Sequence, residues 1–361
     1  MEKKIKVLIV DDSALIRITI RKMLEKYPDI EIIGYAKNGK EALEFIEKTR
    51  PDVITLDIEM PVMDGLETLK RIMSLPNPIP CIMVSGLTAK GADITLKALD
   101  LGAVDFITKP TALASELAKL ELELVEKIRA AVTVDLKKAK RKIIERPEPE
   151  RRLLEIPKLT IKEKPLEKVK YKAVLIGIST GGPPALQEIL PQFPENFPVP
   201  IVVAQHMPPG FTKPMADRLN KLCPLTVVEA NDGDILQKGK IFIGKAGYHI
   251  KIRKRGSIVY LNITKQPEDT LYHPQVDIMY ETAAETLGGD VIAVIMTGMG
   301  SDGSKGLEKL KPKGAYVIAQ DKETSAVFGM PRVAIEKGLV DKVLPLQEIP
   351  KEIVRKIEAS I

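Results

Sequence analysis

The feature that most constrains the fold is a repeated alternation of short apolar runs with amphipathic stretches. In the first third of the 361-residue chain, five such runs are each followed by a helical pattern, at 4–10, 31–36, 52–57, 80–85 and 103–108. Because a helix follows each strand and the connections are short, we expect the strands to be parallel and the helices to cover both faces of the sheet. The pattern predicts a doubly wound α/β domain, in which ligands bind beyond the carboxyl ends of the strands.

The alternation returns in the second half of the chain. Strand-like runs occupy 173–179, 200–206, 290–302 and 314–320, with helical patterns at 184–190, 212–222, 275–287 and 303–310. Runs at 241–244, 248–253 and 257–264 are separated by charged turns and are typical of a small antiparallel β-ribbon. We therefore predict an α/β chain with two doubly wound parallel-sheet domains joined by a linker.

The segment between the domains has a different composition. Apolar spacing at Leu117, Leu120, Leu124 and Ile128 predicts a helix that begins at Thr111 and continues to about Lys142. A stretch rich in proline and charge follows to about residue 169, and such a sequence buries too little apolar surface to fold alone. We expect domains at 1–125 and 170–361, joined by a helical extension and charged linker at 126–169.

Charge is concentrated in this linker. Residues 136–172 carry 14 Lys/Arg against 6 Asp/Glu, a local +8, so the remainder of the +6 chain carries −2. The linker is either a solvated spacer or a basic segment that attracts an acidic partner. No basic face interleaved with aromatic residues appears, which argues against nucleic acid as a partner.

Two further features concern the compartment. The sequence has no apolar stretch long enough to span a membrane and no signal peptide, so we expect no membrane insertion. The two cysteines, Cys81 and Cys223, are far apart and suit a reducing environment. We therefore expect a cytoplasmic protein.

Polar residues in the first domain fall where predicted strands end. Asp11 and Asp12 follow the first strand, Asp57 ends the third, Ser85 ends the fourth, and Lys109 follows the fifth. Three carboxylates at one sheet edge repel one another unless a hard cation such as Mg²⁺ binds their oxygens. A lysine and a hydroxyl beside them suit a phosphoryl group on one aspartate. Helix capping explains each residue singly but not all five together.

On these residues the chain resembles the response-regulator receiver domain, which has a flavodoxin-like fold. The resemblance implies that Asp57 accepts a phosphoryl group from a chemotaxis histidine kinase, and it indicates no particular output. It also implies roles for the surrounding residues: Mg²⁺ ligands in Asp11, Asp12, Asp57 and the carbonyl of Glu59, and phosphoryl sensing by Ser85, Lys109 and Phe106.

The second domain opens with the string Gly177-Ile-Ser179-Thr-Gly181, which fits the G-x-S-x-G turn that raises a serine out of a strand end. A glycine-rich strand–helix junction also binds phosphate, so the string alone leaves both functions open. Three apolar runs, however, deliver Ser179, His206 and Asp302 to the same sheet edge. A serine needs an imidazole to take its proton, and the imidazole needs a carboxylate to orient it.

Other residues compete for these roles. His273 is the main alternative base, Asp277 is an alternative orienting carboxylate, and His249 lies inside a predicted strand where packing is the expected role. Asp302 also suits a helix cap at Gly303. The glycine-rich segment 297–303 offers backbone N–H groups at a helix start, which suit an oxyanion.

Taken together, the strings ISTGG, QHMPPGFT and MTGMGSDG resemble the catalytic domain of the chemotaxis protein-glutamate methylesterases, a Rossmann-like serine hydrolase. The resemblance implies Ser179 as nucleophile, His206 as general base and acid, and Asp302 as orienting carboxylate. Met299 would help to hold the oxyanion through its backbone N–H, and Thr180 would line the site. The chain departs from the family at His273 and Gln275, where arginine and serine are usual, which affects substrate fit more than the triad.

The resemblance implies a phosphorylation-regulated hydrolase that demethylates glutamyl methyl esters on the cytoplasmic helical bundle of chemoreceptors and releases methanol. It also makes deamidation of receptor glutamines an expected second activity. The hydrolase would need no cofactor, and Mg²⁺ belongs to the receiver. We expect the unphosphorylated receiver to cover the Ser179 crevice. A general serine esterase and a non-catalytic nucleotide-responsive protein remain alternatives.

Overall fold

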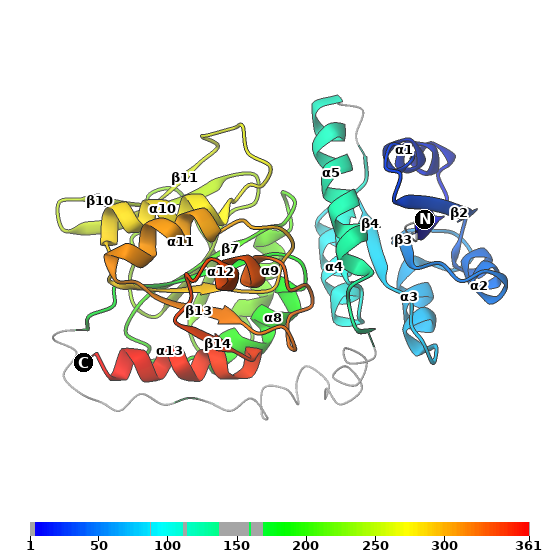
Figure 1. Cartoon of the computed structure of the whole chain (residues 1–361). Coiled ribbons are helices and arrows are strands. Elements are labelled where there is room, and N and C mark those ends of the chain that lie inside the picture. Colours follow the sequence, from blue (N-terminus) through cyan, green and yellow to red (C-terminus); the bar gives the residue numbers. More distant parts are fainter. Residues whose placement is uncertain (1–3, 87, 111–113, 137–158, 160–168, 361) are drawn as a thin grey trace. The chain divides into compact units, whose positions relative to one another are not determined.

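The structure is a computed structural model that describes residues 4–86, 88–110, 114–136, 159 and 169–360. The chain divides into two compact units, residues 1–147 and 148–361 (Figure 1). The predicted tether from 146 to about 169 lies almost wholly outside the described residues. Among the described residues, no helix is long and apolar enough to cross a membrane.

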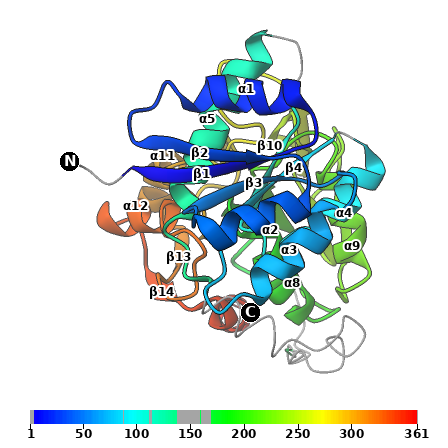
Figure 2. The same ribbon diagram turned by 90° about the vertical axis from the view of Figure 1, so that its right-hand side faces the viewer.

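The first unit is a five-stranded parallel sheet with the strand order β2-β1-β3-β4-β5. Figure 2 shows α1 on one side of this sheet and α2 and α3 on the other. Its elements alternate as the sequence predicts: β1 (Ile5–Val10), α1 (Ala14–Leu24), β2 (Ile30–Ala36), α2 (Gly39–Lys48), β3 (Val53–Asp57), α3 (Gly65–Ser74), β4 (Cys81–Ser85), α4 (Ala89–Asp100), β5 (Asp105–Thr108) and α5 (Ala114–Ala131).

Helix starts in this unit are set by side-chain caps. Ser13, Asn38, Asp64 and Thr88 each accept a hydrogen bond from a backbone N–H of the first turn of α1, α2, α3 and α4. These bonds satisfy donors that have no partner within the helix. The caps therefore fix where each helix begins after its strand, and they leave the strand ends free for the site.

Helix α5 differs from the prediction in length. It ends at Ala131, and residues 132–135 are not helical, so the predicted helix is interrupted there; Leu136 is helical again, and the rest of the predicted continuation, 137–142, lies outside the described residues. The run Val132-Thr133-Val134 is β-branched, and Thr133 Oγ1 donates to the carbonyl of Ala130, which favours a turn over a helix. Beyond the predicted boundary at 125, Ile128, Ala131 and Leu136 pack into the core of the first unit.

The second unit is a seven-stranded parallel sheet with the order β14-β13-β12-β6-β7-β9-β8 and a separate two-stranded ribbon. Figure 1 shows α10 and α11 on one side of the sheet and α13 on the other. Its main elements are β6 (Ala173–Ile178), α8 (Gly182–Ile189), β7 (Ile201–Gln205), α9 (Thr212–Asn220), β8 (Thr226–Glu229), β9 (Lys240–Ile243), β10 (His249–Arg255), β11 (Ile258–Thr264), α10 (Val276–Leu287), β12 (Val291–Ile295), α11 (Ser304–Leu310), β13 (Tyr316–Gln320), α12 (Met330–Glu336), β14 (Lys342–Leu344) and α13 (Ile349–Glu358).

The antiparallel ribbon is smaller than predicted. Strands β10 and β11 form it, but the run at 241–244 instead enters the main sheet as β9, parallel to β7 and β8. The reason is burial, since Ile241, Phe242 and Ile243 are all nearly inaccessible, as expected for a strand covered on both faces. The charged turns on either side of this run led to its prediction as part of the ribbon.

The strand order of each sheet has one point at which the direction of chain progression switches. In the first, the chain reverses direction across the sheet between β1 and β3, and in the second between β6 and β12. Ligands of doubly wound sheets bind outside the carboxyl ends of strands at this point. Residues after β1 and β3, and residues after β6, β7 and β12, are therefore the candidates for function.

Candidate active site and phosphorylation site

The nucleophile candidate lies in a tight turn between β6 and α8. Ser179 follows the last residue of β6, and its backbone N–H donates to the carbonyl of Thr297 at 2.9 Å. Gly181 adopts a left-handed conformation with φ of 77°, which a glycine adopts without steric cost. The turn thus places the Ser179 side chain at the carboxyl edge of the sheet, beside the segment that follows β12.

Three of the predicted residues form a continuous hydrogen-bonded chain. His206 Nδ1 lies 3.0 Å from Ser179 Oγ, and His206 Nε2 lies 2.6 Å from Asp302 Oδ2. A carboxylate can only accept, so Nε2 carries the ring proton and Nδ1 is left to accept from the serine hydroxyl. The side chains of His206 and Asp302 are 6% and 5% exposed, so these bonds are protected from water. This is the arrangement that activates a serine.

Asp302 is held from behind by the start of α10. Its Oδ2 accepts the N–H of Val276 at 2.7 Å, and its Oδ1 accepts the N–H groups of Asp277 and Gly303, both at 2.9 Å. Burial alone would raise the pKa of Asp302, but His206 and these N–H groups hold it below its usual value. The cap predicted as an alternative does not form, because α11 begins with Gly303 as its N-cap and has no side-chain cap; Asp302 instead binds the first N–H groups of α10.

Asp277 does not contact His206 among the hydrogen bonds of the site. Its Oδ1 accepts the N–H of Gly306 at 2.8 Å, and it lies against Asp302. Burial, followed by the charge of Asp302, raises the pKa of Asp277 to about 6. Asp277 therefore lies behind the carboxylate that meets the imidazole.

The two other histidines lie next to one another beside the site. His249 is fully buried at the start of β10; one of its ring nitrogens meets the Pro267 carbonyl at 2.9 Å, and the other accepts the N–H of Gln275 at 3.3 Å. Burial lowers the pKa of His249 to about 4, which agrees with the packing role expected for it. His273 stacks at a tilt on His249, with ring centroids 4.3 Å apart, and does not take the place of His206 beside Ser179.

The backbone of the segment that follows β12 passes close to Ser179. A Cβ placed on Gly298 would lie 2.7 Å from Ser179 Cβ, so only glycine allows this approach. Met299 follows directly, and Thr180 is buried with its carbonyl accepting from Thr297 Oγ1 at 2.9 Å. Met299 and Thr180 thus belong to the two segments that meet at Ser179.

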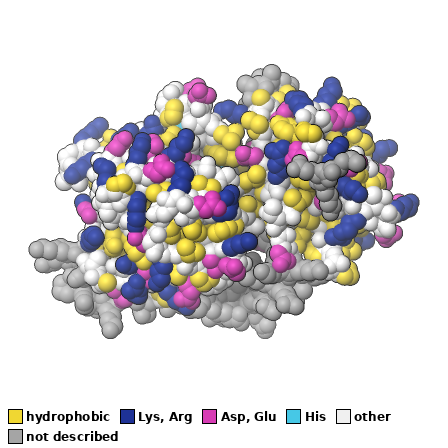
Figure 3. Space-filling view, viewed as in Figure 1, with side chains coloured by type: hydrophobic (Ala, Val, Ile, Leu, Met, Phe, Trp, Pro, Cys, Tyr) yellow, Lys and Arg dark blue, Asp and Glu magenta, His cyan; other side chains and the backbone are white. Residues whose placement is uncertain are grey.

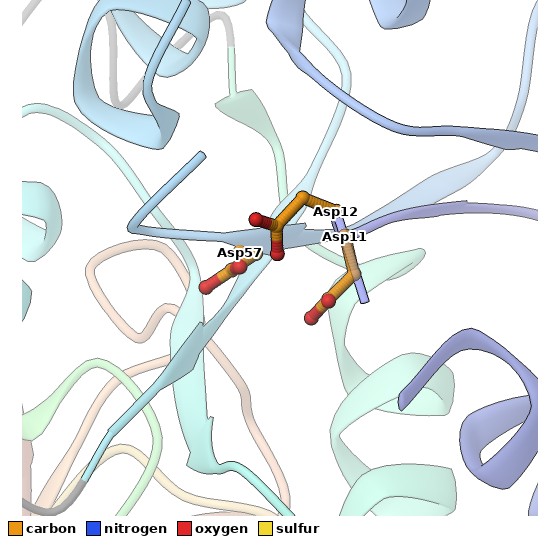
Figure 4. Close-up of side chains that lie close together, drawn as sticks. All are labelled: Asp11, Asp12 and Asp57. Carbon is orange, nitrogen blue, oxygen red and sulfur yellow. The ribbon is translucent and has the colours of Figure 1, made fainter. Parts of the chain in front are cut away.

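In the first unit, the predicted acidic residues come together (Figure 4). Asp11, Asp12 and Asp57 each offer an oxygen within 4.8 Å of the others. Lys109 Nζ donates to Asp57 Oδ2 at 2.8 Å, and the N–H of Glu59 donates to Asp57 Oδ1 at 3.2 Å. Burial raises the pKa of Asp57 despite the neighbouring lysine.

Asp11 supplies the test of whether a cation fits. Its Oδ2 is buried and has no hydrogen-bond partner among the described residues. Burial, with the charge of Asp57, raises its pKa to about 6, so an ionised Asp11 is costly without a positive partner. A cleft of about 450 Å³ adjoins the cluster, lined in part by Asp12, Glu59 and Asp64. Hard carboxylate oxygens around a cleft of this kind fit Mg²⁺.

The predicted phosphoryl-sensing residues are not all gathered at Asp57. Ser85 is buried, and its Oγ accepts from Thr95 Oγ1 at 2.8 Å and donates to the Gly86 carbonyl at 3.3 Å. Phe106 is 2% exposed, and Lys127 of α5 donates to its carbonyl at 2.5 Å. Only Lys109 of the three contacts Asp57 through a hydrogen bond or ion pair.

Sequence reasoning missed two residues of the Ser179 site, Tyr272 and Gln205. The ring of Tyr272 stacks on His206 with centroids 3.9 Å apart and planes 10° apart. Gln205 donates to the carbonyls of Ser179 and His206. Gln205 directly precedes His206, so its place at the strand end was a usable signal, whereas Tyr272 lies in a loop whose path no pattern predicts.

Comparison with known proteins agrees with the division of the chain into two units. The family model for the CheB methylesterase matches residues 174–353, and that for the response regulator receiver domain matches residues 7–121. A protein-glutamate methylesterase/protein-glutamine glutaminase of Halalkalibacterium halodurans is 46% identical over 99% of both chains. One of the same description from Thermotoga maritima is 44% identical over 99% of both. The crystal structure of the Thermotoga maritima CheB methylesterase catalytic domain covers 51% of this chain and 98% of its own, with 46% identity and a TM-score of 0.50.

Proposed function

The chain belongs to the protein-glutamate methylesterase/protein-glutamine glutaminase family, and on that premise we propose that it hydrolyses glutamyl methyl esters on the cytoplasmic helical bundle of chemoreceptors. The single observation that best supports this activity is the hydrogen-bonded chain from Ser179 through His206 to Asp302. The reaction would take place in the cytoplasm, where the receptor bundle lies, and would serve adaptation in chemotaxis.

The reaction needs four proton movements and two bond exchanges. His206 Nδ1 takes the hydroxyl proton while Ser179 Oγ bonds to the ester carbonyl carbon. The same nitrogen returns the proton to the methoxy oxygen, which leaves as methanol and frees an acyl-serine. Water then attacks the acyl carbon, gives its proton to Nδ1, and the serine oxygen takes that proton as it leaves. Asp302 stabilises the imidazolium formed at each step.

Developing negative charge on the carbonyl oxygen needs donors beside Ser179. Met299 supplies a backbone N–H from the segment that crosses the serine, and Thr180 supplies one from the residue after it, the usual position in such turns. Preformed donors of this kind stabilise the transition state more than the substrate. An amide carbonyl meets the same groups, so the site also suits deamidation of receptor glutamines, with ammonia as the leaving group.

The first unit would regulate this activity. Asp57 would accept a phosphoryl group from a chemotaxis histidine kinase, with Mg²⁺ held by Asp11, Asp12, Asp57 and the Glu59 carbonyl. When bound, Mg²⁺ offsets negative charge on the phosphoryl oxygens and the carboxylates. Lys109 orients the Asp57 carboxylate from the other side. Phosphorylation would shift the chain toward a form in which the receiver no longer covers Ser179.

Methanol release from methylated receptor tests the proposal. Ser179→Ala is expected to lower the rate by at least ~10³-fold, because the covalent route is lost. Ser257→Ala, in the exposed turn between β10 and β11, is the matched control and should leave the rate unchanged. A Ser179→Ala variant that retains the rate of the wild-type protein would exclude Ser179 as the nucleophile.

A further inference from the structure

Gln205 occupies the point where the backbone ladder between β6 and β7 ends. Ile178 is paired with Gln205 in the sheet, and the N–H of His206 donates to the Ile178 carbonyl at 3.1 Å. Beyond these bonds, the chain after β6 turns away to form the Ser179 turn. The nucleophile and the base therefore lie just past the last backbone bond that holds their two strands together.

The Gln205 side chain continues the ladder where the backbone cannot. Its Nε2 donates to the carbonyl of Ser179 at 3.1 Å and to the carbonyl of His206 at 2.7 Å. Both N–H groups of the amide are thus used, one on each segment. Gln205 is 2% exposed, so water does not compete for these bonds. We propose that Gln205 is a positioning residue that fixes the Ser179 backbone relative to His206, an inference that rests on the proposed hydrolase function.

The second half of the glycine pair makes room for this amide. A Cβ on Gly182 would lie 1.9 Å from Gln205 Oε1, so any larger residue would force the Gln205 amide to move. Gly182 lies in the first turn of α8 and, unlike Gly181, does not need a left-handed backbone. Its own N–H donates to the Ser179 carbonyl at 2.8 Å, so that carbonyl accepts from both Gly182 and Gln205.

Stability alone does not explain the choice of residue. Gln205 Oε1 is buried without a hydrogen-bond partner among the described residues, and such an acceptor disfavours the folded state. What the amide contributes is geometric, because one rigid group joins two carbonyls that follow the nucleophile and base side chains. The 3.0 Å distance between Ser179 Oγ and His206 Nδ1 depends on how these two backbone segments are placed.

Gln205→Met in the full chain tests the proposal, because methionine matches the shape of glutamine without its N–H groups. We expect kcat for methanol release from methylated receptor to fall ~10- to 100-fold, with KM within ~3-fold, as a small misplacement of reacting groups does. Gln192→Met is the matched control: Gln192 is also buried and its Nε2 donates to the Glu188 carbonyl, but it lies away from Ser179. Its kcat should stay within ~2-fold of the wild-type value.

Gly182→Ala supplies a second, independent variant, because the new methyl group would displace the Gln205 amide. Its kcat should fall by a similar factor. The Gly182→Ala/Gln205→Met double variant should have a kcat no lower than that of the less active single variant, because both substitutions remove the same hydrogen bonds of the Gln205 amide. Additive losses, or a Gln205→Met variant with a lower unfolding temperature but unchanged kcat, would overturn the proposal. A wild-type chain that releases no methanol would instead overturn the hydrolase function.

Discussion

Asp302 shows how one residue serves structure and chemistry together. Gln275 makes no side-chain cap for α10, and Asp302 from a distant loop takes that place with bonds to two of the first N–H groups of the helix. A negative charge at a helix N-terminus is favourable, so the helix stabilises the same ionised form that His206 needs. The rigid helix start therefore fixes the carboxylate in the position that orients the imidazole.

Asp302→Asn is expected to lower kcat by ~10⁴-fold while the protein stays folded, because an amide does not stabilise the imidazolium and can favour the wrong tautomer. Asp217→Asn, on the exposed face of α9, is the control for a surface carboxylate and should leave kcat unchanged. Methanol release and circular dichroism together check this prediction. A variant with nearly full activity would remove Asp302 from the triad.

Asp277 makes the stability of the folded protein depend on pH. Its pKa is raised to about 6 by burial and by Asp302, so between about pH 4 and 6 the folded state holds more protons than the unfolded state. The free energy of unfolding therefore falls as pH rises through this window, and the loss is complete once pH is clearly above the folded pKa, by about pH 7. Among the described residues, Lys309 of α11 and Tyr280 of α10 also interact electrostatically with Asp277.

Asp277→Asn should remove that cost, since an amide cannot ionise. We expect the unfolding temperature of the variant relative to the wild-type protein to increase as pH rises from 4 to 7, and to level off above that. Calorimetry over this pH range measures the difference. A gap that does not vary with pH would show that Asp277 does not titrate in the folded protein.

At the residue scale, the sequence predicted the catalytic side chains but not all of the side chains that pack around them. Ser179, His206 and Asp302 were predicted from three strand ends, and the structure brings them within hydrogen-bonding distance. Tyr272, which stacks on the imidazole, was not predicted because it lies in a loop between the ribbon and α10. Sequence patterns encode the end of a strand, whereas the return path of a loop depends on packing far from it in sequence.

At the scale of elements, helix α5 belongs to the first domain over its whole described length. Leu124, Val125 and Ile128 are buried in the core of the first unit, and Arg129 forms two hydrogen bonds with Asp29. The sequence periodicity predicted the helix but not its end, because the apolar spacing continues past Ala131. The β-branched residues that follow interrupt the helix locally.

Ile128→Ala should therefore destabilise the first domain by ~2–5 kcal/mol, the usual cost of a large cavity in a core. Leu122→Ala on the same helix is the control: Leu122 is 48% exposed, and its loss should change the free energy of unfolding by less than ~0.5 kcal/mol. Urea denaturation followed by circular dichroism measures both. Equal effects of the two substitutions would contradict the packing of α5.

At the scale of the whole molecule, two sheets of similar topology place two different chemistries at equivalent edges. The alternation of strands and helices was enough to predict a parallel sheet in each domain, but not strands β8, β9 and β14 of the second sheet; the tether that joins the domains lies almost wholly outside the described residues. In Figure 3, basic and acidic side chains are interspersed over the visible face of the described residues. This mixed surface agrees with the expectation that the positive net charge belongs to the linker.

Phosphorylation should connect the two sites. A small-molecule phosphodonor with Mg²⁺ is expected to raise the methanol release rate of the intact chain, because a tenfold rise in a rare open form needs only ~1.4 kcal/mol. Asp57→Asn should abolish the increase without lowering the basal rate. A fragment that begins near Val169 should be more active than the unphosphorylated intact chain, and equal rates would end the inhibition hypothesis.

The central claim is that His206 activates Ser179, and covalent labelling tests it most directly. A fluorophosphonate reacts only with an activated serine, so incubation with the full chain followed by peptide mass mapping locates that serine. We predict a single labelled residue, Ser179, and a labelling rate at least ~10²-fold lower in His206→Gln. Label on another residue, or an unchanged rate in His206→Gln, would contradict the account.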